Sequence, residues 1–255
     1  MKKVFLLLGF STLLLSCEKE MDKETVFKGA EVSVHHGKAW SWIRLNNEGA
    51  PQQLAVSIND AALHSLPIGT SGGDHTHENN VIIPLHPAAA TATPFKFIGS
   101  DWNPSGHDGP GGVYEKPHFD FHFYMVSEAE MQQAVDPAKL DMHPEAAYIP
   151  QNHVPGPAVP QMGKHWIDVT SPELKGQPFT ETFIYGSYNG KINFYEPMIT
   201  LDFLKKTSAY ERSIPQPIKF EQAGYYPTRL RLVKRDGVTE IILDAFVYRQ
   251  ASKEN

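Results

Sequence analysis

Cysteine is almost absent from this chain, with one residue, Cys17, in 255. A single thiol excludes an internal disulfide and a zinc site built on several cysteines. Basic residues are also few: 23 lysines and arginines stand against 29 aspartates and glutamates, which gives a net charge of −6. Nucleic-acid binding needs positive charge gathered on one face, and here the basic residues are scattered. The sequence therefore predicts no nucleic-acid partner.

Long apolar runs are missing apart from one near the N-terminus. The apolar segment from Val4 to Leu15 follows two lysines and ends in Leu14-Leu15-Ser16-Cys17. It is too short for a permanent membrane span, so we interpret residues 1–16 as a lipoprotein signal peptide. Cys17 would then be the first residue of the mature chain and would carry a lipid. The alternative is an ordinary signal sequence that happens to contain a cysteine.

The segment after Cys17 is charged and has almost nothing to bury. Residues 17–25 are therefore predicted to be a flexible tether between the lipid and the folded part. This predicts export and lipid anchoring in the cell envelope, in the outer membrane, facing either the periplasm or the surface. No repeat or low-complexity linker divides the rest, so residues 26–250 are predicted to form a single β-rich domain.

Turn signals between alternating segments define the fold class. Twenty prolines and nineteen glycines indicate many turns, and Asn189-Gly190 and Asp236-Gly237 are typical of two-residue hairpins. Short helices are expected after the capping residues Asn59 or Asp60, Ser127 and Thr200. We predict a mainly β (α+β) fold, a single antiparallel β-barrel or sandwich-like domain with two or three short helices. Residues 141–163, with five prolines, are expected to be an irregular surface excursion.

One segment, Pro117 to Tyr124, alternates titratable and aromatic side chains with a period of two. In a β-strand this pattern places His118, Asp120 and His122 on one face and three phenylalanines on the other. The aromatic face is expected to pack into a core, and the polar face is then held rigidly. The pattern favours a metal or ligand site.

Strand geometry limits how one ion could use these residues. Side chains two residues apart on one face are separated by about 6.6 Å, and those four apart by about 13 Å. One ion therefore does not easily bind both histidines of the strand. A mononuclear site would combine Asp120 with His118 or His122, and the remaining candidate ligands are His107, His165 and Glu196. Two histidines and one carboxylate suit zinc, iron or manganese as the cofactor.

A structural explanation of the same residues stays open. His118, Asp120 and His122 could form a buried hydrogen-bonded ladder in which the carboxylate holds one imidazole tautomer. Glu196 could equally be a carboxylate bonded to nearby amides at the end of a strand. His165 could be a core histidine beside Trp166.

A second histidine cluster, His75 and His77, follows Ser71-Gly72-Gly73. A glycine-rich loop loses much entropy on ordering, so a weak or adventitious zinc or copper site is favoured there over a catalytic one. The sequence has no zinc-protease H-E-x-x-H motif. No catalytic residue is assigned, and the sequence does not decide whether the protein is an enzyme.

A longer block carries a family resemblance. Asp101 to His107 reads D-W-N-P-S-G-H, and P-H-F-D-F-H-F-Y follows at residues 117–124. Together they resemble a family of exported bacterial proteins of unknown function, over roughly residues 29–248. The resemblance implies a largely β domain, export and ring-like homo-oligomers, and it brings no catalytic role. Two hypotheses follow: a lipid-anchored protein that binds a divalent metal or small ligand, or a structural module that forms a homo-oligomeric ring.

Overall fold

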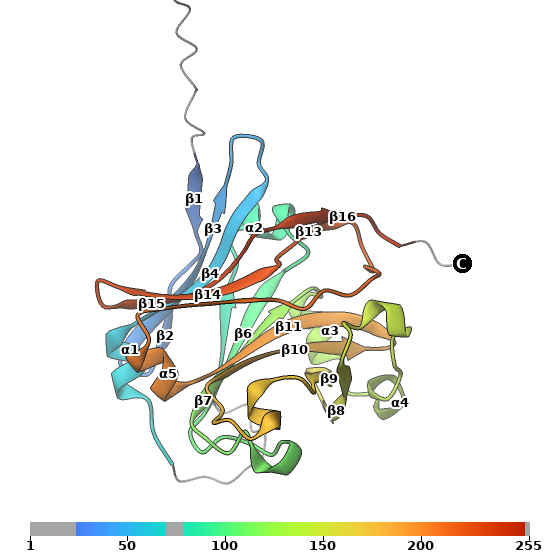
Figure 1. The fold of residues 1–255 in the computed structure, drawn as a ribbon. Helices are drawn as coiled ribbons and strands as arrows, with labels where there is room; N and C mark the ends of the chain where they lie inside the picture. Colours follow the sequence, from blue (N-terminus) through green and yellow to red (C-terminus); the bar gives the residue numbers. More distant parts are fainter. Residues whose placement is uncertain (1–23, 70–78, 253–255) are drawn as a thin grey trace, which may run out of the picture.

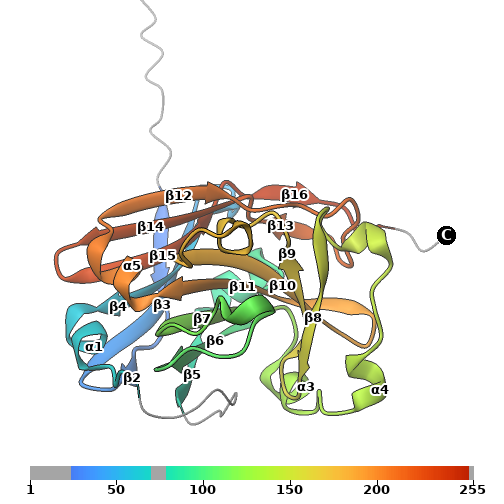
Figure 2. The same cartoon turned by 60° about the horizontal axis from the view of Figure 1, so that its bottom comes forward.

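The computed structural model describes residues 24–69 and 79–252, which form two antiparallel β-sheets. Figure 1 follows the chain through them, and Figure 2 shows the strands of one sheet lying over those of the other. Each sheet has seven strands, and neither closes on itself within the described residues. The predicted mainly β, sandwich-like fold is confirmed.

The first sheet has the strand order β1-β3-β4-β15-β14-β12, with β2 beside β3. Its strands are β1 (Thr25–Lys28), β2 (Val32–Val34), β3 (Gly37–Leu45), β4 (Pro51–Asn59), β12 (Ala209–Ser213), β14 (Arg229–Arg235) and β15 (Val238–Asp244). The second sheet has the order β5-β6-β7-β11-β10-β9-β8. Its strands are β5 (Asn80–Pro84), β6 (Phe97–Asn103), β7 (His118–Tyr124), β8 (His153–Val159), β9 (Gly163–Asp168), β10 (Glu181–Tyr188) and β11 (Lys191–Thr200). A two-stranded ribbon joins β13 (Gly224–Tyr226) to β16 (Val247–Arg249).

The hairpins expected from turn chemistry are present. Asn189 and Gly190 join β10 to β11 with positive φ angles of 52° and 73°. Asp236 and Gly237 do the same between β14 and β15, with φ of 53° and 75°. Two successive positive φ angles match the twist of the flanking strands, which is why these dipeptides start hairpins.

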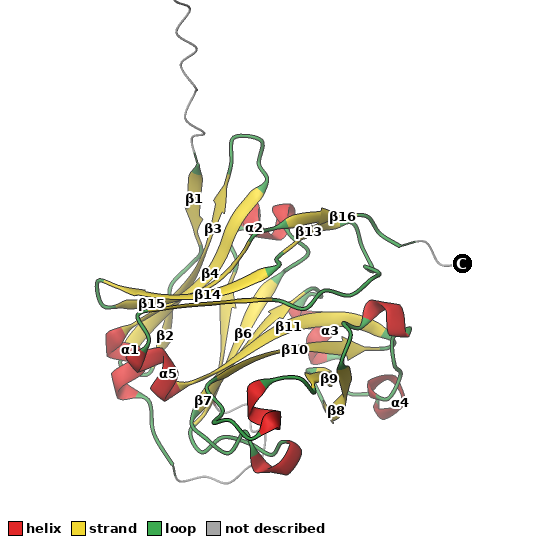
Figure 3. Ribbon diagram, in the orientation of Figure 1, coloured by secondary structure: helices red, strands yellow, loops and turns green. Residues whose placement is uncertain are grey.

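Short helices connect the strands (Figure 3). The three expected ones are confirmed: α1 (Asp60–Ser65) is capped by Asn59, α3 (Glu128–Gln132) by the capping box of Ser127, and α5 (Leu201–Lys206) by Thr200. Two more were not expected, α2 (Pro87–Ala92) and α4 (Pro137–Leu140). In both, proline occupies the first turn, where its missing N–H costs no hydrogen bond.

The prediction of an irregular excursion over residues 141–163 was wrong in part. Residues His153–Val159 form β8, which pairs with β9. β8 is the last strand of the second sheet, and an edge strand tolerates proline because one of its sides needs no ladder hydrogen bonds. Pro155 and Pro157 therefore do not prevent a strand here, although they prevent its prediction from the sequence.

The core between the sheets uses one face of each strand. Phe119, Phe121 and Phe123 of β7 lie in the same buried cluster as Leu54 of β4 and Leu243 of β15. Since side chains alternate along a strand, His118, Asp120 and His122 lie on the opposite face of β7, away from the first sheet. All seven residues of β7 are nevertheless buried. A second layer of the protein must therefore cover the polar face as well.

Several predictions concern residues outside the described ranges. They are the signal peptide, lipidation of Cys17, nearly all of the tether, and the histidines His75 and His77. β1 begins at Thr25, inside the range expected for the tether. No helix among the described residues is long and apolar enough to cross a membrane.

Candidate metal centre

The polar face of β7 gathers further polar side chains from its two neighbours. β6 places Asp101 opposite Asp120 and Asn103 opposite His118. On the other side, β11 places Met198 opposite Asp120, so that Glu196, two residues away, points to the same face. Register in the sheet thus brings side chains from distant parts of the chain onto one surface.

The first cluster, here called the Asp120 group, consists of His107, His118 and Asp120. Nε2 of His118 lies 3.1 Å from Oδ1 of Asp120, and Nε2 of His107 lies 3.3 Å from Oδ2. Asn103 donates a hydrogen bond from Nδ2 to the same Oδ2 at 2.8 Å. One ligand atom from each member of the group lies within 4.8 Å of the other two.

The second cluster, the Glu196 group, consists of His122, His165 and Glu196. One carboxylate oxygen, Oε2 of Glu196, lies 3.5 Å from Nε2 of His122 and 3.5 Å from Nε2 of His165. Glu196 and His122 are each 1% exposed. Two buried groups, each of two histidines and one carboxylate, can therefore hold a metal ion.

Three of the four imidazoles are held in the same way. Their Nδ1 atoms face a backbone carbonyl: Lys116 at 2.6 Å from His118, Asp108 at 2.8 Å from His107, and Pro157 at 3.1 Å from His165. Nδ1 of His122 lies 3.2 Å from the carboxylate of Asp101 but makes no hydrogen bond with it. A carbonyl oxygen only accepts, so Nδ1 of those three rings carries the hydrogen and Nε2 is turned toward the carboxylate. Metal-binding histidines are typically oriented by such a second contact.

Several contacts within the two groups are close without being hydrogen bonds. Nε2 of His118, Oδ1 of Asp120, Nε2 of His122 and Oε2 of Glu196 are buried and have no hydrogen-bond partner among the described residues. Leaving such atoms unsatisfied in a protein interior is costly. Atoms that share an ion aim at a point between them instead of at each other, which gives this combination of short distance and poor hydrogen-bond angle.

The histidines and carboxylates within each group shift one another's pKa values. Burial alone would lower the pKa of His122, but Glu196 and Asp101 outweigh it and raise the pKa to about 9. Burial raises the pKa of Glu196 to about 8, against the opposing effect of His122. In the Asp120 group, the carboxylate outweighs burial and raises the pKa of His107 to about 9. The pKa of Asp120 lies well below its ordinary value because both neighbouring histidines outweigh its burial.

Both groups line one narrow cavity. His107 and Asp120 border it from one group, and His122, His165 and Glu196 from the other. The covering residues come from the loop between β6 and β7 and from β8 and β9; they are Asp108, Gly109, Tyr114, Pro157, Met162 and Ile167. The space open to the centre of a water-sized sphere is about 20 Å³, which is enough for one water molecule.

The six candidate ligands from the sequence are all brought to this face, but not to one point. Asp120 meets His118 and His107, whereas His122 meets Glu196 and His165. The expected combination of Asp120 with His118 or His122 is therefore found with His118, and the candidate ligands fall into two groups. Glu196 is also in the interior of β11, not at a strand end.

Two residues of the site were missed from the sequence, Asp101 and Asn103. Both lie on β6. The signal for them was present, because this strand can be read with the same period of two as the polar motif of β7; its sequence is Phe97-Ile98-Gly99-Ser100-Asp101-Trp102-Asn103. Placing the motif on a strand would have put these two side chains on one face beside β7.

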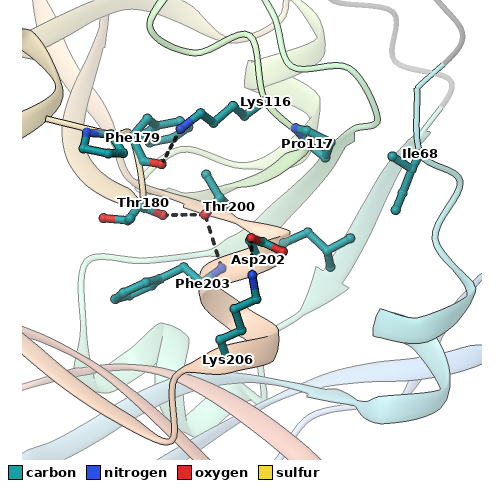
Figure 4. Close-up of a pocket in the computed structure, with 11 residues that line it drawn as sticks. Ile68, Lys116, Pro117, Phe179, Thr180, Thr200, Asp202, Phe203 and Lys206 are labelled. Atoms are coloured by element: carbon teal, nitrogen blue, oxygen red, sulfur yellow. Dashed lines mark hydrogen bonds and ion pairs between the residues drawn. The ribbon is translucent and has the colours of Figure 1, made fainter. Parts of the chain in front are cut away.

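A larger apolar pocket lies on the other side of Phe179 from the Asp120 group, and Figure 4 shows its lining. Its lining includes Lys116, Phe179, Leu201 and Phe203. The ring of Phe179 is buried and packs edge-on against the imidazole of His118, with centroids 5.3 Å apart. Lys116 both lines the pocket and accepts the hydrogen bond from His118 Nδ1 through its backbone carbonyl. Phe179 therefore separates this pocket from the Asp120 group.

Gly186 makes room for the packing of the Glu196 group. The ring of Phe194 lies edge-on to His122 at 4.9 Å and to His165 at 5.3 Å. A Cβ added at Gly186 would stand 2.0 Å from carbons of that ring. Gly186→Ala is expected to cost about 1 to 3 kcal/mol through overpacking, measured by urea unfolding.

The matched control is Gly224→Ala, where the nearest atom is 3.7 Å from the added Cβ. That variant is expected to change the unfolding free energy by less than about 0.5 kcal/mol. Equal losses in the two variants would contradict the packing argument.

No family model, no curated protein and no solved structure matches the chain.

Proposed function

We propose that the protein binds a divalent metal ion at the Glu196 group. The observation that carries the proposal is the position of one carboxylate oxygen at 3.5 Å from two imidazole Nε2 atoms. Ligands at about 2.0 to 2.1 Å from a tetrahedral ion stand about 3.3 to 3.4 Å apart. The side chains are thus already spaced as ligands of one ion, with little movement needed.

The donor set narrows the kind of ion. Two imidazoles and one carboxylate suit zinc, iron or manganese, and they leave at least one coordination position for water or substrate. The Pro157 carbonyl on Nδ1 of His165 would orient that ligand. We leave the reaction, if any, unassigned.

The rival function is a structural module, in which protonated histidines and buried carboxylates form a hydrogen-bonded ladder. It is favoured by the bond from Asn103 to Asp120 and by the raised pKa of His107. In this case the polar face would stabilise the fold or an assembly without binding an ion. We also propose, from the family resemblance, that the protein forms ring-like homo-oligomers.

We also propose that the protein is exported and anchored by a lipid on Cys17. The support is the order of basic, apolar and small residues before that cysteine, followed by a charged segment. The same composition argues against a nucleic-acid partner, since the net charge is −6.

Elemental mass spectrometry of the full chain, purified without a polyhistidine tag, tests the metal proposal. The wild type is expected to retain bound metal after dialysis, and Glu196→Gln is expected to lose the ion of that group. The substitution keeps the shape of the side chain but removes the charge that an ion needs. Glu173→Gln, at another buried carboxylate, should keep the wild-type content. Wild-type protein free of metal after loading with zinc, iron or manganese would reject the proposal.

If the Asp120 group also holds an ion, Phe179, which packs against His118, is expected to control how fast that ion can be removed. Phe179→Ala would open the neighbouring pocket toward His118 and should speed extraction by a chelator roughly tenfold, which corresponds to about 1.4 kcal/mol of barrier. Phe203→Ala, on the same pocket but away from the imidazole, is the control and should leave the rate unchanged. An unchanged rate in Phe179→Ala would show that ions leave by another route.

A further inference from the structure

The Asp120 group could be a metal site or a hydrogen-bonded ladder, and several of its contacts are those expected of a ladder. Asp120 uses one oxygen for His118 and the other for His107, and the second oxygen also accepts from Asn103. In a ladder, each imidazole N–H would point at a carboxylate oxygen. The details of the contact with His118 decide whether this is so.

The contact between His118 and Asp120 is not a hydrogen bond. The two atoms are 3.1 Å apart, yet neither Nε2 of His118 nor Oδ1 of Asp120 has a hydrogen-bond partner among the described residues. A protonated imidazole at this distance would direct its N–H along the line between the atoms. The ladder therefore lacks the bond that it needs most, at a side chain that is fully buried.

The tautomer of His118 is a second argument against a hydrogen-bonded ladder. Its Nδ1 lies 2.6 Å from the carbonyl oxygen of Lys116, which can only accept a hydrogen. In the neutral ring, Nε2 therefore carries a lone pair that faces a carboxylate. Nδ1 of His107 faces the Asp108 carbonyl in the same way. A lone pair on Nε2 of His118 that faces a carboxylate oxygen at 3.1 Å is a repulsive arrangement unless a cation lies between the two atoms.

We propose that the Asp120 group is a second divalent metal site, so that the protein holds a pair of ions facing one cavity. The inference rests on the proposed function only for the first ion. The two groups lie on one sheet face, and members of both line the same narrow space. That space admits about one water molecule, and a solvent molecule shared by two ions is the usual arrangement in two-metal centres.

The predicted ligands of the second ion are His107, His118 and Asp120, and Asn103 orients the carboxylate through its hydrogen bond. The ion is of the same class as the first, because the donor set is again two imidazoles and one carboxylate. The pair gives the cavity a use that the ladder does not, since members of both groups border the space that admits one water. It also explains why two such groups are built side by side.

Metal stoichiometry in five full-length proteins tests this inference. After loading with Mn²⁺ and dialysis, we expect two ions per chain in the wild type, one in Asp120→Asn, one in Glu196→Gln and none in the double variant. Electron paramagnetic resonance should show coupled ions in the wild type and an isolated ion in each single variant. Glu173→Gln, which removes a buried carboxylate outside both groups, should retain two coupled ions.

The outcomes separate the two proposals. One ion in the wild type that is kept in Asp120→Asn and lost in Glu196→Gln would overturn the second site and leave the proposed function intact. No ion in the wild type would overturn both. If Asp120→Asn does not fold, His107→Gln replaces it, because His107 lies in the loop between β6 and β7 and not on a strand. Two ions in His107→Gln with unchanged coupling would also overturn the inference.

Discussion

Zinc should raise the free energy of unfolding of this protein by about 4 kcal/mol when the free ion is about a thousandfold above its dissociation constant. The reason is that the ligands of the Glu196 group converge only in the folded state, on β7, β9 and β11. For a domain of this size, the gain corresponds to a rise of roughly 8 to 16 °C in the unfolding temperature. Calorimetry with and without zinc measures it directly.

The controls identify where the ion binds. Magnesium prefers oxygen ligands and keeps its waters, so the same concentration should leave the unfolding temperature unchanged. The variant with Asp120→Asn and Glu196→Gln together should lose the zinc effect, although it keeps His75 and His77. An equal zinc effect in this variant and in the wild type would place the ion elsewhere in the chain.

The polar face of β7 could be predicted from the sequence because its signal is local. Alternation over seven residues fixes which side chains share a face, whatever the rest of the fold does. His118, Asp120 and His122 were identified in this way, and all three are buried on one side of the strand. The hairpins and caps were predictable for the same reason, since each depends on two to four neighbouring residues.

The partners of each histidine could not be predicted, because they depend on strand order and register. β7 lies between β6 and β11, and β11 comes about seventy residues later in the sequence. Nothing local shows that Glu196 would meet His122 instead of Asp120. The division of six candidate ligands into two groups is therefore a result of tertiary structure.

For strand β8, the local propensity of proline gave a wrong prediction, because the position of the strand in the sheet overrides that propensity. Its prolines indicate an irregular loop by propensity alone. The edge of the sheet removes the penalty, and β8 then supplies the Pro157 carbonyl that holds His165. Pro157, which argues against a strand in the sequence, thus contributes a contact to the site.

The stability of the metal-free protein should fall at alkaline pH, and bound metal should remove this dependence. In the metal-free protein, the pKa of His122 is raised to about 9 by Glu196 and Asp101 against the opposing effect of burial, from an ordinary value of 6.5. A raised pKa in the folded state stabilises it fully below pH 6.5, and this contribution is lost as the pH rises through 9. The raised pKa of Glu196, about 8, acts in the same direction above its ordinary value of 4.5. The metal-free protein should therefore lose stability between pH 6.5 and 9.

The metal-loaded protein should keep a nearly constant stability over the same interval, because the rising metal affinity offsets the loss seen without metal. An ion binds neutral imidazole and ionised carboxylate, so at pH 7 it must displace protons from His122 and Glu196. Each displaced proton makes the apparent affinity rise about tenfold per pH unit, until the pH passes the pKa of the group. Urea unfolding at pH 6.5 and pH 9, with zinc held at a fixed free concentration by a buffering chelator, compares the two cases. A loss of stability toward pH 9 that is the same with and without zinc is what the hydrogen-bonded ladder predicts, and it would decide for the structural role.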